Sequence, residues 1–166
     1  MSLSSHEQAL LTELANRDAE AIRLFSTEYG PPVYGFLISA LGFRAGEAKP
    51  MMVEAFASLI RHSKKAATEM PILPCLMRDL LNHLQWKMSD KESEGPFEGA
   101  YQELSLIFKA LSRLPWEERV LVLLRDQMDL TYPEMSFVLS LSEEELKARL
   151  GFAKTNFRNT VSGLTR

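Results

Sequence analysis

A chain of 166 residues with 46% hydrophobic residues suits one domain or two small ones, each able to bury an ordinary core. No apolar run approaches the ~20 residues of a membrane span. The first residues, MSLSSHEQALL, lack the basic and long apolar segments of a secretory signal. The single cysteine, Cys75, excludes an internal disulfide and favours a reducing compartment. We therefore expect a cytoplasmic protein.

The net charge of −3 gives no overall electrostatic attraction to nucleic acid. Neither half of the chain is basic. Residues 1–90 hold 9 Lys and Arg against 10 Asp and Glu, and residues 91–166 hold 10 against 12. Any affinity for DNA would have to come from a local patch and from a partner.

Apolar residues recur at helical spacing in the first part of the chain, whereas alternating strand patterns are nearly absent. Four helices are predicted. The expected segments are a helix around Ala21 to Phe25, one from Pro31 to near Gly42, one from Pro50 to Arg61 and one from Pro74 to about Met88.

The polar segment DKESEGPFEG, Asp90 to Gly99, carries two glycines and a proline and is interpreted as a linker. Beyond it, we expect helices over Tyr101 to Leu114 and from Pro115 onward. The predicted fold is all-α, with two small helical domains at residues 1–90 and 100–166 and a linker at 91–99.

Two capping signals stand close together near the C-terminus. Thr131 followed by Glu134 forms one capping box pattern, and Ser142 followed by Glu145 forms a second. Ser140-Leu141 lies between them as a tight turn. This spacing predicts a helix-turn-helix, and the last helix has its core stripe at Leu146, Leu150, Ala153, Phe157 and Val161.

The outer side of that last helix has a charge pattern that suits DNA. At ~100° per residue, Lys147, Lys154 and Arg158 fall on one flank and Arg149 on the other. Such cations could hold phosphates on both sides of an exposed strip. The strip consists of Glu144, Ala148, Gly151 and Thr155. The alternative is a solvated helix face with ordinary charge alternation.

These motifs resemble the C-terminal promoter-binding region of bacterial RNA polymerase sigma factors of the extracytoplasmic-function type. The shared elements are Leu114-Pro115 with Arg119, TYPEMS from Thr131, and LKARL from Leu146 with Ala153. The resemblance implies binding to the minus-thirty-five promoter element. The residues that it places at the DNA are Thr131, Tyr132, Ser142, Lys147, Arg149, Lys154 and Arg158.

The first part resembles the family's polymerase-binding domain through RDAEAIRLFSTEYGPPVYGFLISALG and AKPMMVEAFASLIR. The resemblance implies polymerase contacts at Met51, Met52, Glu54 and Phe56. It also implies that Trp86 and Lys87 face the minus-ten element. Of the family's "asp-x-x-gln-glu" pattern, however, only Glu54 is kept. Gly151-Phe152 stands where a basic pair is common, and Ser140 where the turn usually has glycine.

We hypothesise a divergent sigma factor whose partners are core RNA polymerase, promoter DNA and an anti-sigma factor, with no membrane and no small-molecule substrate. An alternative is a sigma-like decoy that captures an anti-sigma factor without driving transcription, and a third is another helical regulator. An enzyme is not expected, since the three histidines have no ligand spacing with Cys75 and no Gly-rich phosphate loop occurs. No metal or cofactor is expected.

Overall fold

The computed structural model describes residues 3–41, 45–63, 70–88 and 106–165. Within these ranges the chain forms eight α-helices and one π-helical segment, and no strand. The all-α prediction is therefore confirmed. No helix of the described ranges is long and apolar enough to cross a membrane. The predicted linker, Asp90 to Gly99, lies outside the described residues.

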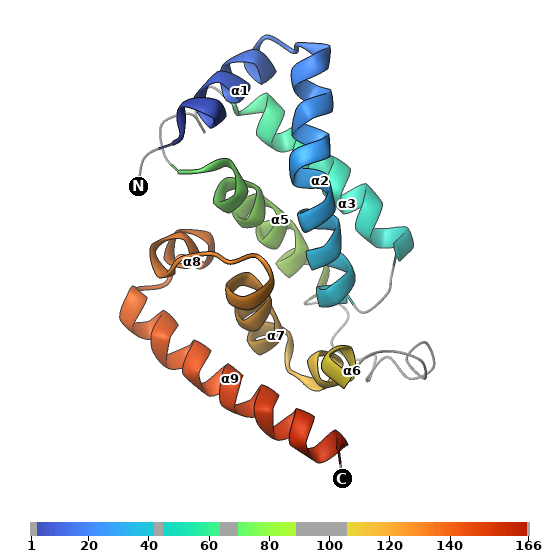
Figure 1. Ribbon diagram of the computed structural model, residues 1–166, viewed down its shortest axis with the longest axis vertical. Coiled ribbons are helices and arrows are strands. Elements are labelled where there is room, and N and C mark those ends of the chain that lie inside the picture. The colour runs from blue at the N-terminus through green and yellow to red at the C-terminus, as the bar shows by residue number, and fades with distance from the viewer. Residues whose placement is uncertain (1–2, 42–44, 64–69, 89–105, 166) are drawn as a thin grey trace.

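Within the described residues, the first lobe contains four helices (Figure 1). Its core is built around α2 and α5, whose fully buried side chains include Phe25, Phe36 and Leu76. Cys75 is buried as well, as expected of a small apolar residue. The helices are α1 Ser5–Ala15, α2 Ala19–Leu41, α3 Ala45–Arg61 and α5 Ile72–Met88.

Proline does not begin α2 or α3, which corrects the sequence prediction. The helix α2 runs through Pro31 and Pro32, and α3 begins at Ala45 and runs through Pro50. All three prolines are exposed, so water can solvate the carbonyls that lose a helical N–H partner. The buried faces on either side hold each helix together across the missing hydrogen bonds. Pro74 fits the general rule better, since it lies in the first turn of α5.

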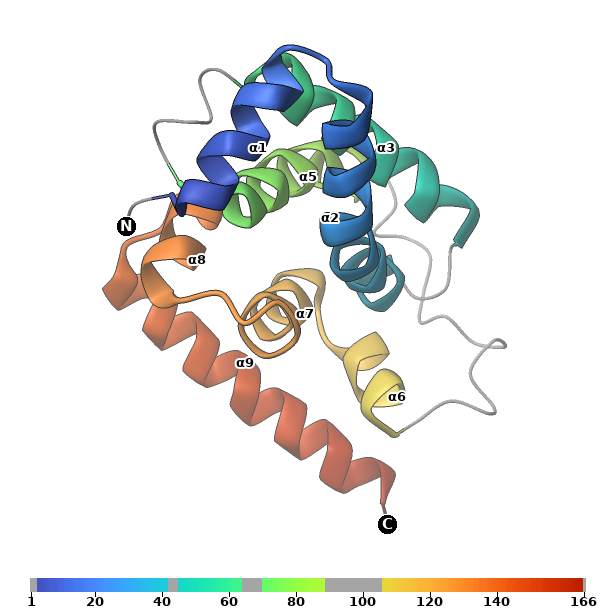
Figure 2. The ribbon, with the colours of Figure 1, turned by 45° about the horizontal axis from the view of Figure 1, so that its top comes forward.

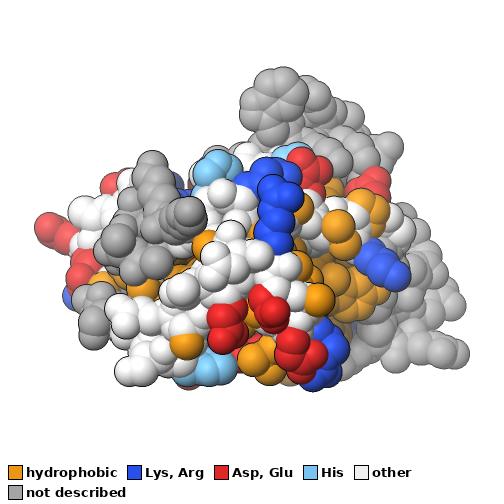
Figure 3. Space-filling view, turned by 90° about the horizontal axis from the view of Figure 1, so that it is seen from above, with side chains coloured by type: hydrophobic (Ala, Val, Ile, Leu, Met, Phe, Trp, Pro, Cys, Tyr) orange, Lys and Arg blue, Asp and Glu red, His pale blue; other side chains and the backbone are white. Residues whose placement is uncertain are grey.

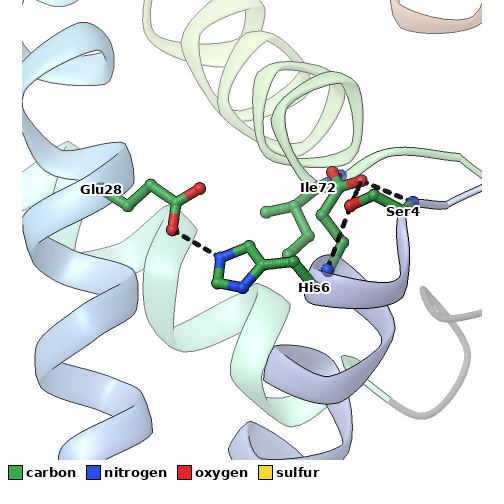
Figure 4. Close-up of polar contacts among 5 residues, drawn as sticks. Ser4, His6, Glu28 and Ile72 are labelled. Carbon is green, nitrogen blue, oxygen red and sulfur yellow. Dashed lines mark hydrogen bonds and ion pairs between the residues drawn. The ribbon is translucent and has the colours of Figure 1, made fainter.

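A single carboxylate joins the starts of α1 and α5. Glu7 accepts hydrogen bonds from the Ser4 N–H at 3.0 Å and the Ser4 hydroxyl at 2.8 Å, which completes a capping box on α1. Its other oxygen accepts from the Ile72 N–H at 3.0 Å, where α5 begins (Figure 4). Beside it, His6 contacts Glu28 of α2 at 3.1 Å. These contacts fix three helices at one end of the lobe.

The second lobe contains the helix-turn-helix. Buried side chains from each of its elements meet in one core, including Val120, Leu124, Met135 and Leu146. Ile107 of α6, by contrast, is 58% exposed. The elements are α6 Leu106–Arg113, α7 Trp116–Val122, the π-helical η1 Leu123–Gln127, α8 Tyr132–Leu139 and α9 Glu143–Leu164.

The predicted stripe of α9 faces that core. Leu146, Leu150 and Ala153 are buried, and the stripe becomes half-buried toward the C-terminal end at Phe157 and Val161. The helix runs along the outside of the second lobe, against α6, α7 and α8 (Figure 1). Its opposite side is therefore left on the molecular surface.

The two lobes pack directly against each other. Figures 1 and 2 both show α5 between the rest of the first lobe and the helix-turn-helix, and α5 contacts α8 extensively. At this contact the guanidinium of Arg78 lies 4.0 Å from the centre of the Phe137 ring, a cation–π geometry. The buried residues of both lobes form one continuous cluster.

Arg119 is a buried cation that connects the lobes. It is 6% exposed, and its guanidinium donates to the Ala40 carbonyl at 2.7 Å, near the end of α2. It also donates to the carbonyls of Ser112 at 3.2 Å and Leu114 at 3.0 Å, at the end of α6. The ends of two helices, where unpaired carbonyls carry partial negative charge, thus share one cation.

We expect Arg119→Met to lower the free energy of unfolding by about 3 kcal/mol, because buried carbonyls at two helix ends lose a charged donor. Urea unfolding followed by circular dichroism measures this change. The control is Arg113→Met, which removes the same group from an exposed position on α6. Equal stability of the two variants would contradict the proposed role of Arg119.

We expect Glu7→Gln to destabilise the chain by about 1 kcal/mol at neutral pH, as loss of a helix cap does. Burial alone would raise the pKa of Glu7, but the hydrogen bonds from Ile72 and Ser4 outweigh it and lower the pKa below 4.5. A lowered pKa in the folded state stabilises the fold above about pH 4.5, and this stabilisation is lost as pH falls through the folded-state pKa.

The difference in unfolding free energy between wild type and Glu7→Gln should therefore be constant from pH 6 to 8 and shrink below about pH 4.5. Unfolding in urea at a series of pH values tests this. Glu13→Gln, at an exposed position of the same helix, controls for the loss of one negative charge. A difference that grows toward acid pH would contradict the assignment.

Candidate nucleic-acid interface

The first helix of the helix-turn-helix begins at the predicted capping box. The Thr131 hydroxyl oxygen accepts from the Glu134 N–H, and the Glu134 carboxylate accepts from the Thr131 N–H at 2.7 Å. The Tyr132 ring follows, half-buried against the core, with the charged groups of Arg125 and Lys147 each 5.2 Å from its centre. Of these predicted DNA-binding residues, Thr131 has its hydroxyl engaged in the cap.

The turn between the two helices places Ser140 in the left-handed conformation, at φ 54° and ψ 39°. The Ser136 hydroxyl donates to the Leu141 carbonyl at 2.8 Å and so closes the turn. Ser142 then caps α9 by accepting from the Glu145 N–H at 3.2 Å. The Glu145 carboxylate does not return to the cap as predicted, because it binds Arg149 one turn further along the helix.

Cations flank the outer strip of α9 as predicted, and an acidic side chain neighbours most of them. Lys147 lies 3.5 Å from Glu143, and Lys154 lies 2.7 Å from Asp126 of η1. Arg149 pairs with Glu145 and lies 3.9 Å from Glu117 of α7. Among the described residues, Arg158 has no ion pair.

These pairs are too exposed to add much to stability. In each pair, about a third or more of each side chain is exposed to solvent, so the surrounding water screens the attraction. A phosphate could therefore replace a carboxylate at little cost. In the chain without DNA, the outer surface of α9 is nevertheless close to neutral. This agrees with the sequence, in which neither half of the chain is basic.

The strip between the two flanks is open. Glu144, Ala148, Gly151 and Thr155 are all exposed, as expected. Phe152 lies at the edge of this strip by the same count of ~100° per residue. Its ring is 63% exposed, the largest exposure among the exposed large apolar side chains of the described chain.

The structure divides the predicted polymerase-binding residues of α3 into two groups. Glu54 is exposed and Met52 half-buried, and Val53 beside them is 56% exposed. Met51 and Phe56 are 4% and 8% exposed and belong to the core, where the Phe56 ring packs 4.7 Å from that of Phe25. Helical periodicity explains this division, since positions 51 and 56 lie on the same inward face as Ala48, Ala55 and Leu59.

Trp86 and Lys87 lie in the last turn of α5, and their side chains fall outside the described residues. Their contact with the minus-ten element stays a prediction.

Figure 3 shows the end of the molecule seen from above Figure 1, where acidic and basic side chains are interspersed. In the part of this face that is described, charge of neither sign dominates.

Some features of the interface could have been found from sequence. Glu143 and Glu145 each stand four residues before a cation, the spacing of a helical ion pair. Asp126 and Glu117 come from other elements, and only the fold brings them to α9. The cation–π contact of Arg78 with Phe137 likewise depends on how the lobes meet.

Comparison with known proteins supports the resemblance found in the sequence. Residues 104–156 match the family model of sigma-70, region 4. The fold is similar to that of CnrH, solved in complex with the cytosolic domain of CnrY, with a TM-score of 0.72 and 15% identity over 95% of this chain and 97% of that one. No curated protein sequence gives a significant match.

A second similar structure is the sigma factor RpoE from Bartonella quintana, solved in complex with the anti-sigma factor NepR. Its TM-score is 0.68 at 14% identity, and the match covers 84% of this chain and 96% of that one. The fold is therefore that of sigma factors, with a sigma-70 region 4 match over the helix-turn-helix. The family match covers part of the second lobe, and the likeness to the two solved structures shows the fold of both lobes.

We expect Ser140→Gly to stabilise the chain by about 1 kcal/mol, because glycine adopts the left-handed conformation without steric strain. The matched control is Ser26→Gly, the same change at an exposed position in the interior of α2, which should destabilise by about 0.5 kcal/mol. Thermal unfolding distinguishes the two signs. A lower melting temperature for Ser140→Gly would contradict the strain argument.

We expect the double variant Glu143→Gln, Glu145→Gln to bind duplex DNA about three- to tenfold more tightly at low salt, because it frees Lys147 and Arg149 for phosphates. Fluorescence anisotropy with a labelled duplex measures the affinity. Glu13→Gln with Glu54→Gln makes the same change in net charge on the other lobe. If both double variants gain equally, net charge and not the α9 pairs governs binding.

Proposed function

We propose that this chain is a sigma factor of the extracytoplasmic-function type, which binds core RNA polymerase and directs initiation at a restricted set of promoters. The proposal rests on one observation above all. A doubly capped helix-turn-helix, with cations on both flanks of an open strip, overlaps the region 4 match up to residue 156. The chain is then a cytoplasmic transcription factor and not an enzyme.

In this proposal α9, α3 and the end of α5 each have a separate role. The helix α9 enters the major groove of the minus-thirty-five element, with Lys147 and Arg149 as principal contacts and Lys154 and Arg158 on phosphates. On α3, the exposed Glu54 and half-buried Met52 contact polymerase. Trp86 and Lys87 at the end of α5 meet the minus-ten element, where an aromatic ring can stack on an unpaired base.

Low DNA affinity of the free chain is compatible with this function. Lys147, Arg149 and Lys154 of α9 pair with carboxylates, and the net charge of the chain is negative. Once bound to polymerase, the helix-turn-helix meets promoter DNA at a high effective concentration, so a weak contact suffices. Specificity then depends on α9, and affinity on the polymerase.

Engagement of both promoter elements requires the lobes to separate. The two elements are about 25 base pairs apart, or about 85 Å along B-form DNA. A compact chain of this length has a radius of gyration of only about 15 Å. We therefore propose that the closed arrangement, with α5 against α8, belongs to the free or inhibited protein and opens on polymerase.

An anti-sigma factor is the proposed regulatory partner. RpoE was solved with an anti-sigma factor and CnrH with the cytosolic domain of CnrY, and the likeness to CnrH extends over both lobes of this chain. This supports the closed arrangement as the form that such a partner recognises. The partner would stabilise the chain against opening.

A second candidate function is a decoy that captures an anti-sigma factor without driving transcription. The specific observation in its favour lies on α3, where Met51 and Phe56 are buried and only Glu54 keeps the polymerase-binding pattern. A decoy would bind the anti-sigma factor but not core polymerase. Co-elution with core polymerase therefore distinguishes the two functions.

We expect Lys147→Ala with Arg149→Ala to abolish promoter-dependent transcription in vitro while co-elution with core polymerase stays intact. Lys109→Ala with Arg113→Ala removes the same charge from α6, away from the strip, and should retain transcription. Transcription by the α9 double variant at the wild-type level would contradict the assignment of α9 to DNA. Absence of polymerase binding by the wild type would favour the decoy.

A further inference from the structure

The outer face of α9 carries an apolar line that the core does not use. Phe152 is 63% exposed, and Ala148 and Thr155, four residues before it and three after it, are exposed too. Residues at these spacings lie next to one another on a helix. The Thr155 hydroxyl donates to the Gly151 carbonyl at 2.9 Å, so its methyl group is the part left free to contact a ligand.

The side chains along this line differ from those that recognise guanine. Guanine is read most often by a bidentate arginine or lysine. Here the cations stand on the flanks, and Lys147 and Arg149 are engaged by carboxylates on α9 itself. Two methyl groups, from Ala148 and Thr155, lie in the strip between the flanks, and the phenyl ring of Phe152 lies at its edge. The base edge that such groups recognise is the thymine methyl in the major groove.

We propose that α9 recognises thymine methyl groups through Phe152, with Ala148 and Thr155 beside it. This inference rests on the proposed DNA-binding function and specifies its target. Duplex DNA is favoured over a protein partner because cations flank the line on both sides and match the two phosphate backbones of a groove. The space beside Gly151, where an added Cβ would meet nothing within 4 Å, lets a base edge approach.

The helix geometry sets the length of the recognised element. Ala148 and Thr155 are seven residues apart, which is about 10 Å along the helix axis. This matches about three base-pair steps. The minus-thirty-five element of this chain should therefore contain thymines within a window of about four base pairs, at the position where Phe152 contacts the groove.

Substitution of deoxyuridine for thymidine removes the methyl group and leaves base pairing unchanged, so it tests this contact directly. Duplexes are first selected from a random library with the full chain bound to core polymerase. The selected sequence is then made with thymidine or deoxyuridine in the window. We expect wild type to bind the deoxyuridine duplex about three- to tenfold more weakly.

The variant Phe152→Ala should bind both duplexes equally, at the level of wild type on deoxyuridine. Ile107→Ala, which shortens an exposed apolar residue of α6, should keep the wild-type difference. Selected DNA that wild type binds equally with or without the methyl would overturn this inference and leave the proposed function intact. Failure to select any DNA would instead overturn the proposed function.

Discussion

The arrangement of the whole molecule depends on the buried guanidinium of Arg119. It supplies donors to carbonyls at the ends of α2 and α6, one in each lobe, where a helix has no N–H groups left to offer. Removal of a charge from water is costly. The guanidinium of Arg119 is stable in the interior only because these carbonyls replace its hydration. The position of α7 is thereby fixed against α2, and the helix-turn-helix that follows α7 is fixed with it.

A closed molecule of this kind separates two requirements that a promoter-binding protein has to meet. The helix-turn-helix is rigid, since both of its helices are capped and its stripe is buried. The outer surface of α9, however, is nearly neutral while the chain is alone, because carboxylates of the same lobe pair with Lys147, Arg149 and Lys154. Such a surface would avoid non-specific binding to DNA and still become effective once polymerase holds it at a promoter.

Much of the fold could be predicted from sequence because its signals are local. Capping boxes and apolar stripes located α8 and α9, and Pro115 located the start of α7. The same local reasoning failed at Pro31, Pro32 and Pro50, where burial of both neighbouring turns overrides the preference of proline for helix starts. Two features depend on tertiary packing, and no sequence pattern predicts them. They are the π-helical turn at Leu123–Gln127 and the contact between Arg78 and Phe137.

The central claim is that a closed free protein opens when it binds polymerase at a promoter. Energy transfer between dyes on Asn82→Cys of α5 and Asn159→Cys of α9 tests it most directly, since both positions are exposed and native Cys75 is buried. We expect efficient transfer in the free chain and a marked fall when core polymerase and promoter DNA are added. Unchanged transfer in a complex that co-elutes with polymerase would contradict it.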